Sequence, residues 1–204
     1  SSRKSVEYPL FADASMHDTG ASLVDMKWVG ATADIPAKVG GAVQFKKFMR
    51  VASPKAGSLN KPIGAGNGWN GGAMSTYAFT ANDKNGIRGV RFTPTVDKKQ
   101  AMFGLNRGSD SETYQDLDYA MQLQSQNYVG IYENGKSLGN TGKWKVGSVC
   151  EVVVDNQGDV RYIVDGETRY VSKTPVKYPL NVDVSIHDQG AAFNDIQYVG
   201  ATSE

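Results

Sequence analysis

Two groups of acidic residues in this sequence could bind a cation. The first contains four acids within nine residues, Asp110, Glu112, Asp116 and Asp118, and the second is the run Asp155–Asp159, which reads DNQGD. Calcium takes about six to eight oxygen ligands and usually several carboxylates. A calcium site formed by the four acids is therefore one hypothesis. The alternatives are a solvated polar loop for the first group and a hairpin tip for the second.

Aromatic residues with polar neighbours could bind a sugar. Sugar recognition needs a flat ring that stacks on the pyranose face, and amide or carboxylate groups that bond the hydroxyls. The sequence offers such residues in three places, and the predicted ligand-binding set is Trp69, Asn70, Tyr114, Asp116 and Trp144. The alternative is that both tryptophans are core residues, as large aromatics in a sandwich usually are. Tyr114 has polar neighbours and is expected to be the most exposed of the rings.

The histidines and the single cysteine indicate structure more than chemistry. His17 and His187 each begin a sequence H-D-x-G, where the Asp can bond a backbone N–H and the Gly can take positive φ. We therefore expect turns there, with a general base or a metal ligand as the alternative. Cys150 lies in the apolar run Val149–Val154 and is predicted to be an inert core thiol. No zinc spacing or Ser-His-Asp order stands out, and Gly64–Gly68 lacks the Lys-Ser/Thr of a phosphate loop.

The composition argues against several classes of partner. The 204 residues include 22 Lys and Arg against 21 Asp and Glu, so the net charge is close to zero. We therefore expect no nucleic-acid partner and no binding to an anionic membrane surface. The sequence has no apolar run of about 18 residues, so we expect no membrane insertion. The length favours one domain with a sizeable core.

Short strands are the elements expected to position these groups. Gly and aromatic residues are frequent, apolar and polar residues alternate in segments such as Leu117–Gln124, and no helical period is sustained. Asn82–Gly86 is a predicted hairpin turn, and Asn134-Gly135 is a predicted turn. Ala52–Asn70 is a long loop of a kind that is often functional. Turn signals about every 8–12 residues predict an all-β sandwich or a closed barrel.

The order of motifs from Trp69 onward carries a family resemblance. The segments concerned include Trp69–Ser75, Gly89–Phe92, Phe103–Leu105, Asp116–Ala120, Val129–Gly135 and Gly158–Tyr162. This order resembles that of concanavalin A-like lectin/glucanase (laminin G-like) jelly-roll domains, over about residues 43–200. The resemblance implies an antiparallel two-sheet sandwich. It also implies a secreted or cell-surface protein that binds carbohydrate, although a fold does not fix an activity.

Glucanases of this fold family suggest a test for catalysis. Glycoside hydrolysis needs two carboxylates about 5–10 Å apart. The resemblance implies a pattern E-x-D-x-E on one strand, where alternation places the acids on one face. The nearest match here is Asp116-Leu117-Asp118, which lacks both glutamates. We therefore expect the chain not to be an enzyme, and glycan cleavage is the weakest of three functional hypotheses.

The two ends of the chain are copies of each other. Tyr8–Thr32 and Tyr178–Thr202 agree at 14 of 25 aligned positions, which predicts a tandem repeat of about 170 residues. We predict that residues 1–34 are the closing hairpin of a preceding repeat plus a hinge, and that residues 35–204 form a complete repeat. The first functional hypothesis is an extracellular carbohydrate-binding or adhesion module. The second is a structural repeat that assembles with neighbouring copies by strand exchange into a stalk or filament.

Overall fold

A computed structural model describes residues 37–108 and 111–201 of the chain. The predicted hairpin of residues 8–29 and the boundary between residues 34 and 35 lie outside the described residues, so both remain predictions. Within the described ranges, no helix is long and apolar enough to cross a bilayer.

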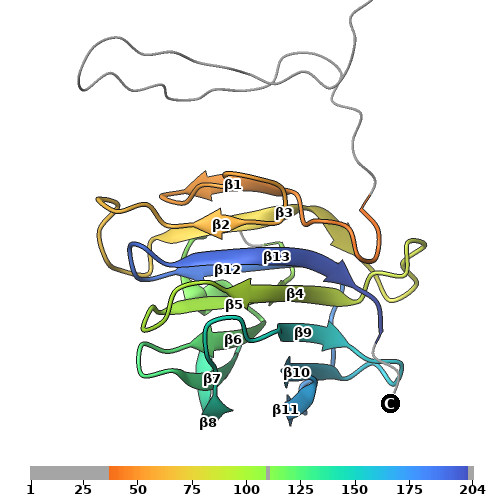
Figure 1. The fold of residues 1–204 in the computed structure, drawn as a ribbon. Helices are drawn as coiled ribbons and strands as arrows, with labels where there is room; N and C mark the ends of the chain where they lie inside the picture. Colours follow the sequence, from red (N-terminus) through yellow and green to blue (C-terminus); the bar gives the residue numbers. More distant parts are fainter. Residues whose placement is uncertain (1–36, 109–110, 202–204) are drawn as a thin grey trace, which may run out of the picture. The chain divides into compact units, whose positions relative to one another are not determined.

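The described residues form two antiparallel sheets that face each other, as predicted (Figure 1). The larger sheet contains, in spatial order, β1 (Phe45–Met49), β3 (Gly71–Phe79), β12 (Leu180–Ile186), β5 (Ala101–Asn106), β6 (Tyr119–Leu123), β7 (Tyr128–Glu133) and β8 (Lys136–Lys143). The smaller sheet contains β11 (Glu167–Val171), β10 (Val160–Val164), β9 (Cys150–Val154), β4 (Gly89–Pro94), β13 (Ala192–Val199) and β2 (Leu59–Asn60). One 3-10 turn, η1 (Tyr114–Asp116), precedes β6.

Aromatic rings in the core join the two sheets. Phe103 of β5 stacks on Phe92 of β4 at a centroid distance of 4.2 Å, and it contacts Phe193 of β13 at 4.6 Å. Phe92 and Phe103 are fully buried, and burying such a side chain contributes about 1.5–3 kcal/mol. Cys150 is also fully buried, so the prediction of a core thiol is confirmed. The core therefore lies between the larger and the smaller sheet.

The turn predictions have mixed outcomes. Asn134 and Gly135 have φ values of 50° and 73° and join β7 to β8, so the prediction of a turn there is confirmed. The prediction of a hairpin around Asn82–Gly86 is wrong, because β3 and β4 belong to different sheets. The Asp83 carboxylate shapes this connection by accepting hydrogen bonds from the backbone N–H groups of Asn85 and Ile87 at 2.9 and 3.1 Å. The chain therefore crosses from one sheet to the other at this turn.

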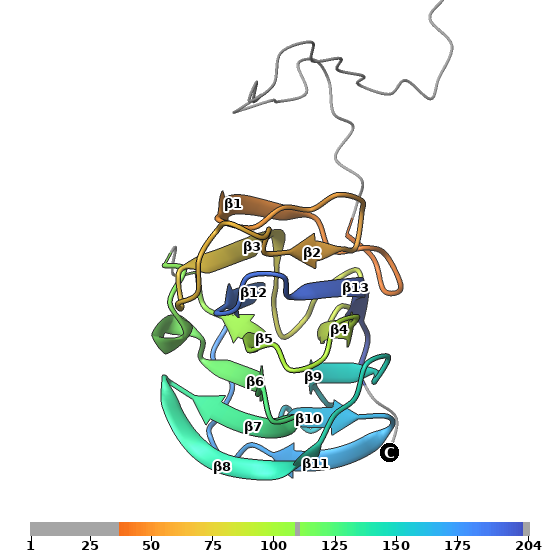
Figure 2. The same cartoon turned by 60° about the vertical axis from the view of Figure 1, so that its left-hand side comes forward.

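A loop covers part of the outer face of the seven-stranded sheet. Figure 2 shows the segment with η1 on the side of this sheet that faces away from the smaller one. Leu117 at the end of this loop packs on Met102 of β5 and Ala120 of β6, and all three side chains are buried. Met102 and Ala120 alternate with the inward-facing residues Phe103 and Met121, because successive side chains of a strand point to opposite faces. The outer face is therefore a second packed surface.

Candidate functional site

Small and polar side chains line the outer face of the seven-stranded sheet. Strand register places them in two neighbouring rows that cross all seven strands. The first row is Met49, Gly72, Ser185, Met102, Gln122, Gly130 and Asn140, and the second is Lys46, Met74, Asp183, Gly104, Ala120, Tyr132 and Ser137. Because glycine, alanine and serine recur in the middle of these rows, the covering loop can approach the sheet closely.

Four rings from four separate segments lie together on this face, and we call them the aromatic row. The centroid of Trp69 is 5.1 Å from that of Tyr114 and 5.1 Å from that of His187. Tyr114 in turn lies 5.9 Å from Tyr132 of β7, with the two planes nearly perpendicular. All four side chains are half-buried. The rings contact one another largely edge to face, an arrangement that aromatic pairs favour.

The loop is held against the sheet by its backbone. The Ser185 hydroxyl of β12 donates a hydrogen bond to the Glu112 carbonyl at 2.7 Å. Gly72 of β3 makes this approach possible, since a Cβ there would lie 3.1 Å from Glu112 Cα and 2.9 Å from Val184 O. Glu112 precedes Tyr114 by two residues, so this contact also helps to position a ring of the aromatic row.

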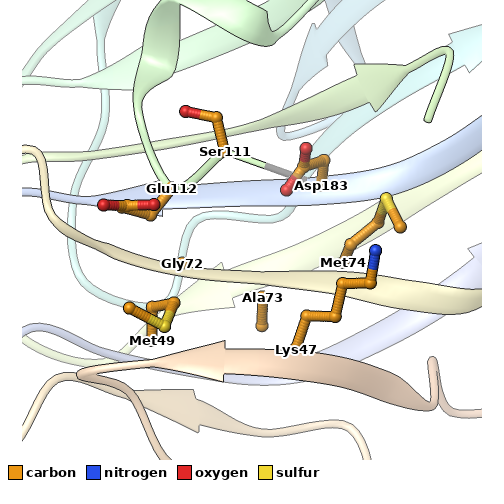
Figure 3. A pocket seen from close by; sticks show the side chains of 8 residues that line it. All are labelled: Lys47, Met49, Gly72, Ala73, Met74, Ser111, Glu112 and Asp183. Carbon is orange, nitrogen blue, oxygen red and sulfur yellow. The ribbon is translucent and has the colours of Figure 1, made fainter. Parts of the chain in front are cut away.

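A small cleft lies on the same face, where the loop meets β1 and β3 (Figure 3). Its lining combines two carboxylates, one ammonium, two thioethers and small residues: Lys47, Met49, Gly72, Ala73, Met74, Ser111, Glu112 and Asp183. Asp183 is 4% exposed, and its Oδ2 accepts a hydrogen bond from the Asn106 amide at 2.7 Å. The lining of the cleft therefore combines charged, polar and apolar groups.

Three side-chain amides form a polar strip: Gln122 of β6, Gln124 directly after β6, and Asn140 of β8. Gln124 Nε2 donates to Gln122 Oε1 at 3.0 Å and to Asn140 Oδ1 at 2.8 Å. The strip crosses β7 at Gly130, where a Cβ would lie only 2.9 Å from Gln124 Nε2 and 3.0 Å from Gln122 Oε1. Each amide carries both donors and acceptors. The strip is therefore suited to a ligand with many hydroxyl groups.

His187 connects the aromatic row to a turn. Its Nδ1 lies 2.5 Å from Asp188 Oδ1, and Asp188 Oδ2 accepts a hydrogen bond from the Gln100 backbone N–H at 2.8 Å. Gly190 has a φ of 80°, so the prediction of a turn at this H-D-x-G sequence is confirmed. The contact of the His187 ring with Trp69 was not predicted, because the two residues are far apart in sequence. His17 lies outside the described residues.

Comparisons with known proteins identify the fold. No family model matches the chain, and no curated protein matches it. The structure is similar to the SPRY domain of human HERC1, with a TM-score of 0.56, 16% identity, and coverage of 76% of this chain and 97% of that one. It is also similar to the carbohydrate recognition domain of Emp46p in its potassium-bound form, with a TM-score of 0.55, 12% identity, and coverage of 78% and 90%. The chain has the concanavalin A-like jelly-roll fold. The carbohydrate recognition domain of Emp47p is a third neighbour, with a TM-score of 0.53, 10% identity, and coverage of 85% and 100%.

The jelly roll brings together part of the predicted ligand-binding set. Trp69 and Tyr114 are in contact in the aromatic row, and Asp116 lies in η1 beside Tyr114. The Asn70 side chain instead accepts a hydrogen bond from Lys61 Nζ at 2.7 Å. The structure does not support the predicted binding role of Trp144, which is a core residue as the alternative interpretation stated. Its ring is 3% exposed and packs in the core, which leaves no face for a sugar.

Two members of the predicted metal set have defined surroundings in the structure. Asp118 forms an ion pair with the Arg107 guanidinium at 3.2 Å and accepts the Arg107 backbone N–H at 2.9 Å. Glu112 lines the cleft, whereas Asp110 lies outside the described residues, so the complete set remains untested. In the ranges that the structure covers, no three acidic, histidine or cysteine side chains gather as metal ligands would. The calcium hypothesis therefore stays a prediction.

The run Asp155–Asp159 is a hairpin tip, as its alternative interpretation stated. Asp155 Oδ1 accepts hydrogen bonds from the backbone N–H groups of Gln157 and Asp159 at 2.9 Å each, and Oδ2 accepts one from Arg161 Nε at 2.6 Å. Burial alone would raise the pKa of Asp155, but the backbone hydrogen bonds and Arg161 outweigh it, so the pKa lies below its usual value. This carboxylate therefore stabilises the β9–β10 turn.

Proposed function

We propose that this chain is a non-enzymatic carbohydrate-binding module whose ligand lies on the outer face of the seven-stranded sheet. The observation that carries the proposal is the aromatic row beside the amide strip. A pyranose ring presents an apolar face of C–H groups and a rim of hydroxyls, so it needs flat rings and convergent polar groups together. Trp69 and Tyr114 supply the rings, and the strip of Gln122, Gln124 and Asn140 supplies donors and acceptors.

Two structural neighbours support the carbohydrate-binding proposal. The matching domains of Emp46p and Emp47p are named carbohydrate recognition domains, and each match covers more than three quarters of this chain. The glycan-cleaving alternative has less support, because one member of the candidate acid pair, Asp118, is taken up by Arg107. A hydrolase would need one free carboxylic acid and one free carboxylate across the glycosidic bond.

The setting of the module forms the wider part of the proposal. We place it in an extracellular or cell-surface adhesion protein built of tandem repeats, because the two ends of the sequence are copies of each other. The alternative is a structural repeat that assembles with its neighbours through residues 1–34. Those residues lie outside the described part of the chain, so self-association remains a prediction from the sequence.

A glycan array tests the proposal, with the full chain applied in the presence of calcium and again in the presence of EDTA. We expect at least one class of glycan to bind. Trp69→Ala should then weaken binding by about 30-fold or more, the effect of losing a hot-spot aromatic worth about 2 kcal/mol. Tyr170→Ala is the matched control, because Tyr170 is a half-buried ring on β11 of the other sheet. A silent array, or equal binding by both variants and the unmodified chain, would refute the proposal. Loss of binding in EDTA would support the calcium hypothesis.

A further inference from the structure

Lys61 directly follows β2, and its side chain is fully buried. Four oxygen atoms surround its Nζ: Gly68 O at 2.8 Å, Asn70 Oδ1 at 2.7 Å, Ile186 O at 3.0 Å and His187 O at 2.8 Å. We call these atoms the oxygen cage. Three of them are backbone carbonyls and one is a side-chain amide, so the ligands of this ammonium are all neutral.

Such an arrangement is unusual for a lysine. Lysine is almost never fully buried unless it is paired with an opposite charge. Burial lowers the pKa of Lys61 and the Arg50 charge lowers it further, while Asp188 acts in the opposite direction. An ammonium has three N–H donors, which are all used when four oxygens lie within 3.0 Å. The cage therefore compensates for the lost hydration by complete coordination of the cation.

The cage joins two segments that are far apart in the sequence. Gly68 and Asn70 flank Trp69, whereas Ile186 ends β12 and His187 directly follows it. The Gly68 backbone N–H also donates to the His187 carbonyl at 2.9 Å, which closes the connection next to the ammonium. Trp69 and His187 are the two rings of the aromatic row that contact each other at one of its ends. A single charged group therefore sits beneath both ring-bearing segments.

We propose that the Lys61 ammonium is a tethered cation that occupies a monovalent-cation site and thereby positions Trp69 and His187 for the ligand. The chemistry of the cage supports this, because rings of neutral carbonyl oxygens are what channel filters use to coordinate K⁺. The positioning of the rings for a ligand rests on the proposed function, whereas the cation site does not. Removal of the lysine side chain should leave a cage that a free K⁺ or NH₄⁺ ion can fill.

Thermal unfolding of Lys61→Ala in different salts tests the cation site. The variant is compared in KCl, NH₄Cl and choline chloride at equal ionic strength, with Lys55→Ala as a matched control because Lys55 is exposed. In choline chloride we expect the Tm of Lys61→Ala to fall by about 5–15 °C, since all four oxygens lose the ammonium, while the Gly68 and His187 carbonyls keep a backbone donor. KCl and NH₄Cl should restore part of that loss by mass action, with no such difference for Lys55→Ala or the unmodified chain. Equal Tm values for Lys61→Ala in all three salts would overturn the proposal.

Two further measurements test the cation site. If Lys61→Ala does not fold in choline chloride, its refolding yield is measured in each salt, and equal yields would count against the cation site. Asn70→Ala removes one oxygen of the cage and keeps the charge. We expect a Tm loss of about 2–5 °C, and an unchanged Tm would show that the cage does not hold the ammonium.

Binding of the best glycan from the array separates this proposal from the proposed function. Potassium or ammonium should restore glycan binding by Lys61→Ala together with its Tm, which a lysine with a merely space-filling role would not allow. If the array is silent but the salts restore the Tm, the cation site stands and the carbohydrate function falls. If a glycan binds but the salts restore nothing, the reverse holds.

Discussion

Two glycines on one row of the candidate site should differ in how much stability they lose on substitution by alanine. Gly72 of β3 and Gly130 of β7 both lie on the outer face of the seven-stranded sheet. Neither residue is among the positions with positive φ, so alanine fits the backbone at both. Any difference between Gly72→Ala and Gly130→Ala must therefore come from the atoms that the new methyl group meets.

At Gly72 the methyl group meets backbone. Its Cβ would lie 2.9 Å from Val184 O and 3.1 Å from Glu112 Cα, and neither neighbour can rotate away. Overpacking of this kind costs about 1–3 kcal/mol, and stretching the Ser185–Glu112 hydrogen bond adds about 1 kcal/mol. The smaller chain entropy of alanine in the unfolded state returns about 0.4–1 kcal/mol. We therefore expect Gly72→Ala to destabilise the protein by about 1–3.6 kcal/mol.

At Gly130 the methyl group meets the ends of flexible side chains. Its Cβ would lie 2.9 Å from Gln124 Nε2 and 3.0 Å from Gln122 Oε1, and both amides can swing away. One partly exposed hydrogen bond would be lost at about 0.5 kcal/mol, which the entropy gain of about 0.4–1 kcal/mol offsets. We expect Gly130→Ala to change the stability by less than about 0.5 kcal/mol. Because the strip is displaced, glycan binding should still weaken by about 10-fold, as for the loss of one net hydrogen bond.

Urea unfolding measures both free energies, and the glycan array or titration calorimetry measures the binding. The two variants share the same substitution, the same sheet and the same face, so each is the control for the other. Equal losses of stability would refute the reasoning from the neighbouring atoms. Unchanged glycan binding by Gly130→Ala would show that the amide strip does not contact the ligand.

Three further predictions concern titratable groups. Asp155→Ala should lose about 3 kcal/mol at neutral pH, since Asp155 is 4% exposed and pairs with Arg161. The folded pKa of Asp155 lies below its unfolded value of about 3.9, so the charge-dependent part of this contribution is present above pH ~4 and is lost as the pH falls through the folded pKa. Urea unfolding across that range should show a smaller difference in stability between the variant and the parent at low pH. Burial raises the pKa of Tyr198 to about 12, so the parent should lose up to about 2.7 kcal/mol of stability as the pH rises from ~10 to ~12. Tyr198→Phe should lack that loss. Parallel curves of stability against pH for the variant and the parent would contradict this prediction. Burial raises the pKa of the Cys150 thiol well above its usual range, so a disulfide reagent at mildly alkaline pH should modify this thiol only after denaturation. Rapid labelling of the native chain would contradict the burial of Cys150 in the core.

Patterns local in the sequence were sufficient for the fold class. Alternation, Asn134-Gly135 and the order of motifs all predicted an antiparallel sandwich, because side-chain period and turn chemistry depend on neighbouring residues. Two strands were not predicted. β2 is two residues long and lies in the predicted loop, and β8 (Lys136–Lys143) is mostly exposed, so neither carries an apolar pattern.

Local patterns in the sequence predicted only part of the candidate site. Trp69 and Tyr114 could be selected from the sequence, because a large ring beside polar residues is visible there. His187, Gln122 and the cage of Lys61 could not be selected, since each acquires its role from a partner that is distant in the chain.

The sequence alone determined that the strands alternate, where most of them turn, and that its two ends are copies. Tertiary structure alone decided which sheet each strand joins, as the wrong hairpin at Asn82–Gly86 shows. It also decided which of two aromatic candidates is exposed: Trp144 is in the core and Trp69 is on the outer face. The physical reason is that a period of two assigns residues to opposite faces of a strand. Which face meets the core depends on contacts between strands that lie far apart in the chain.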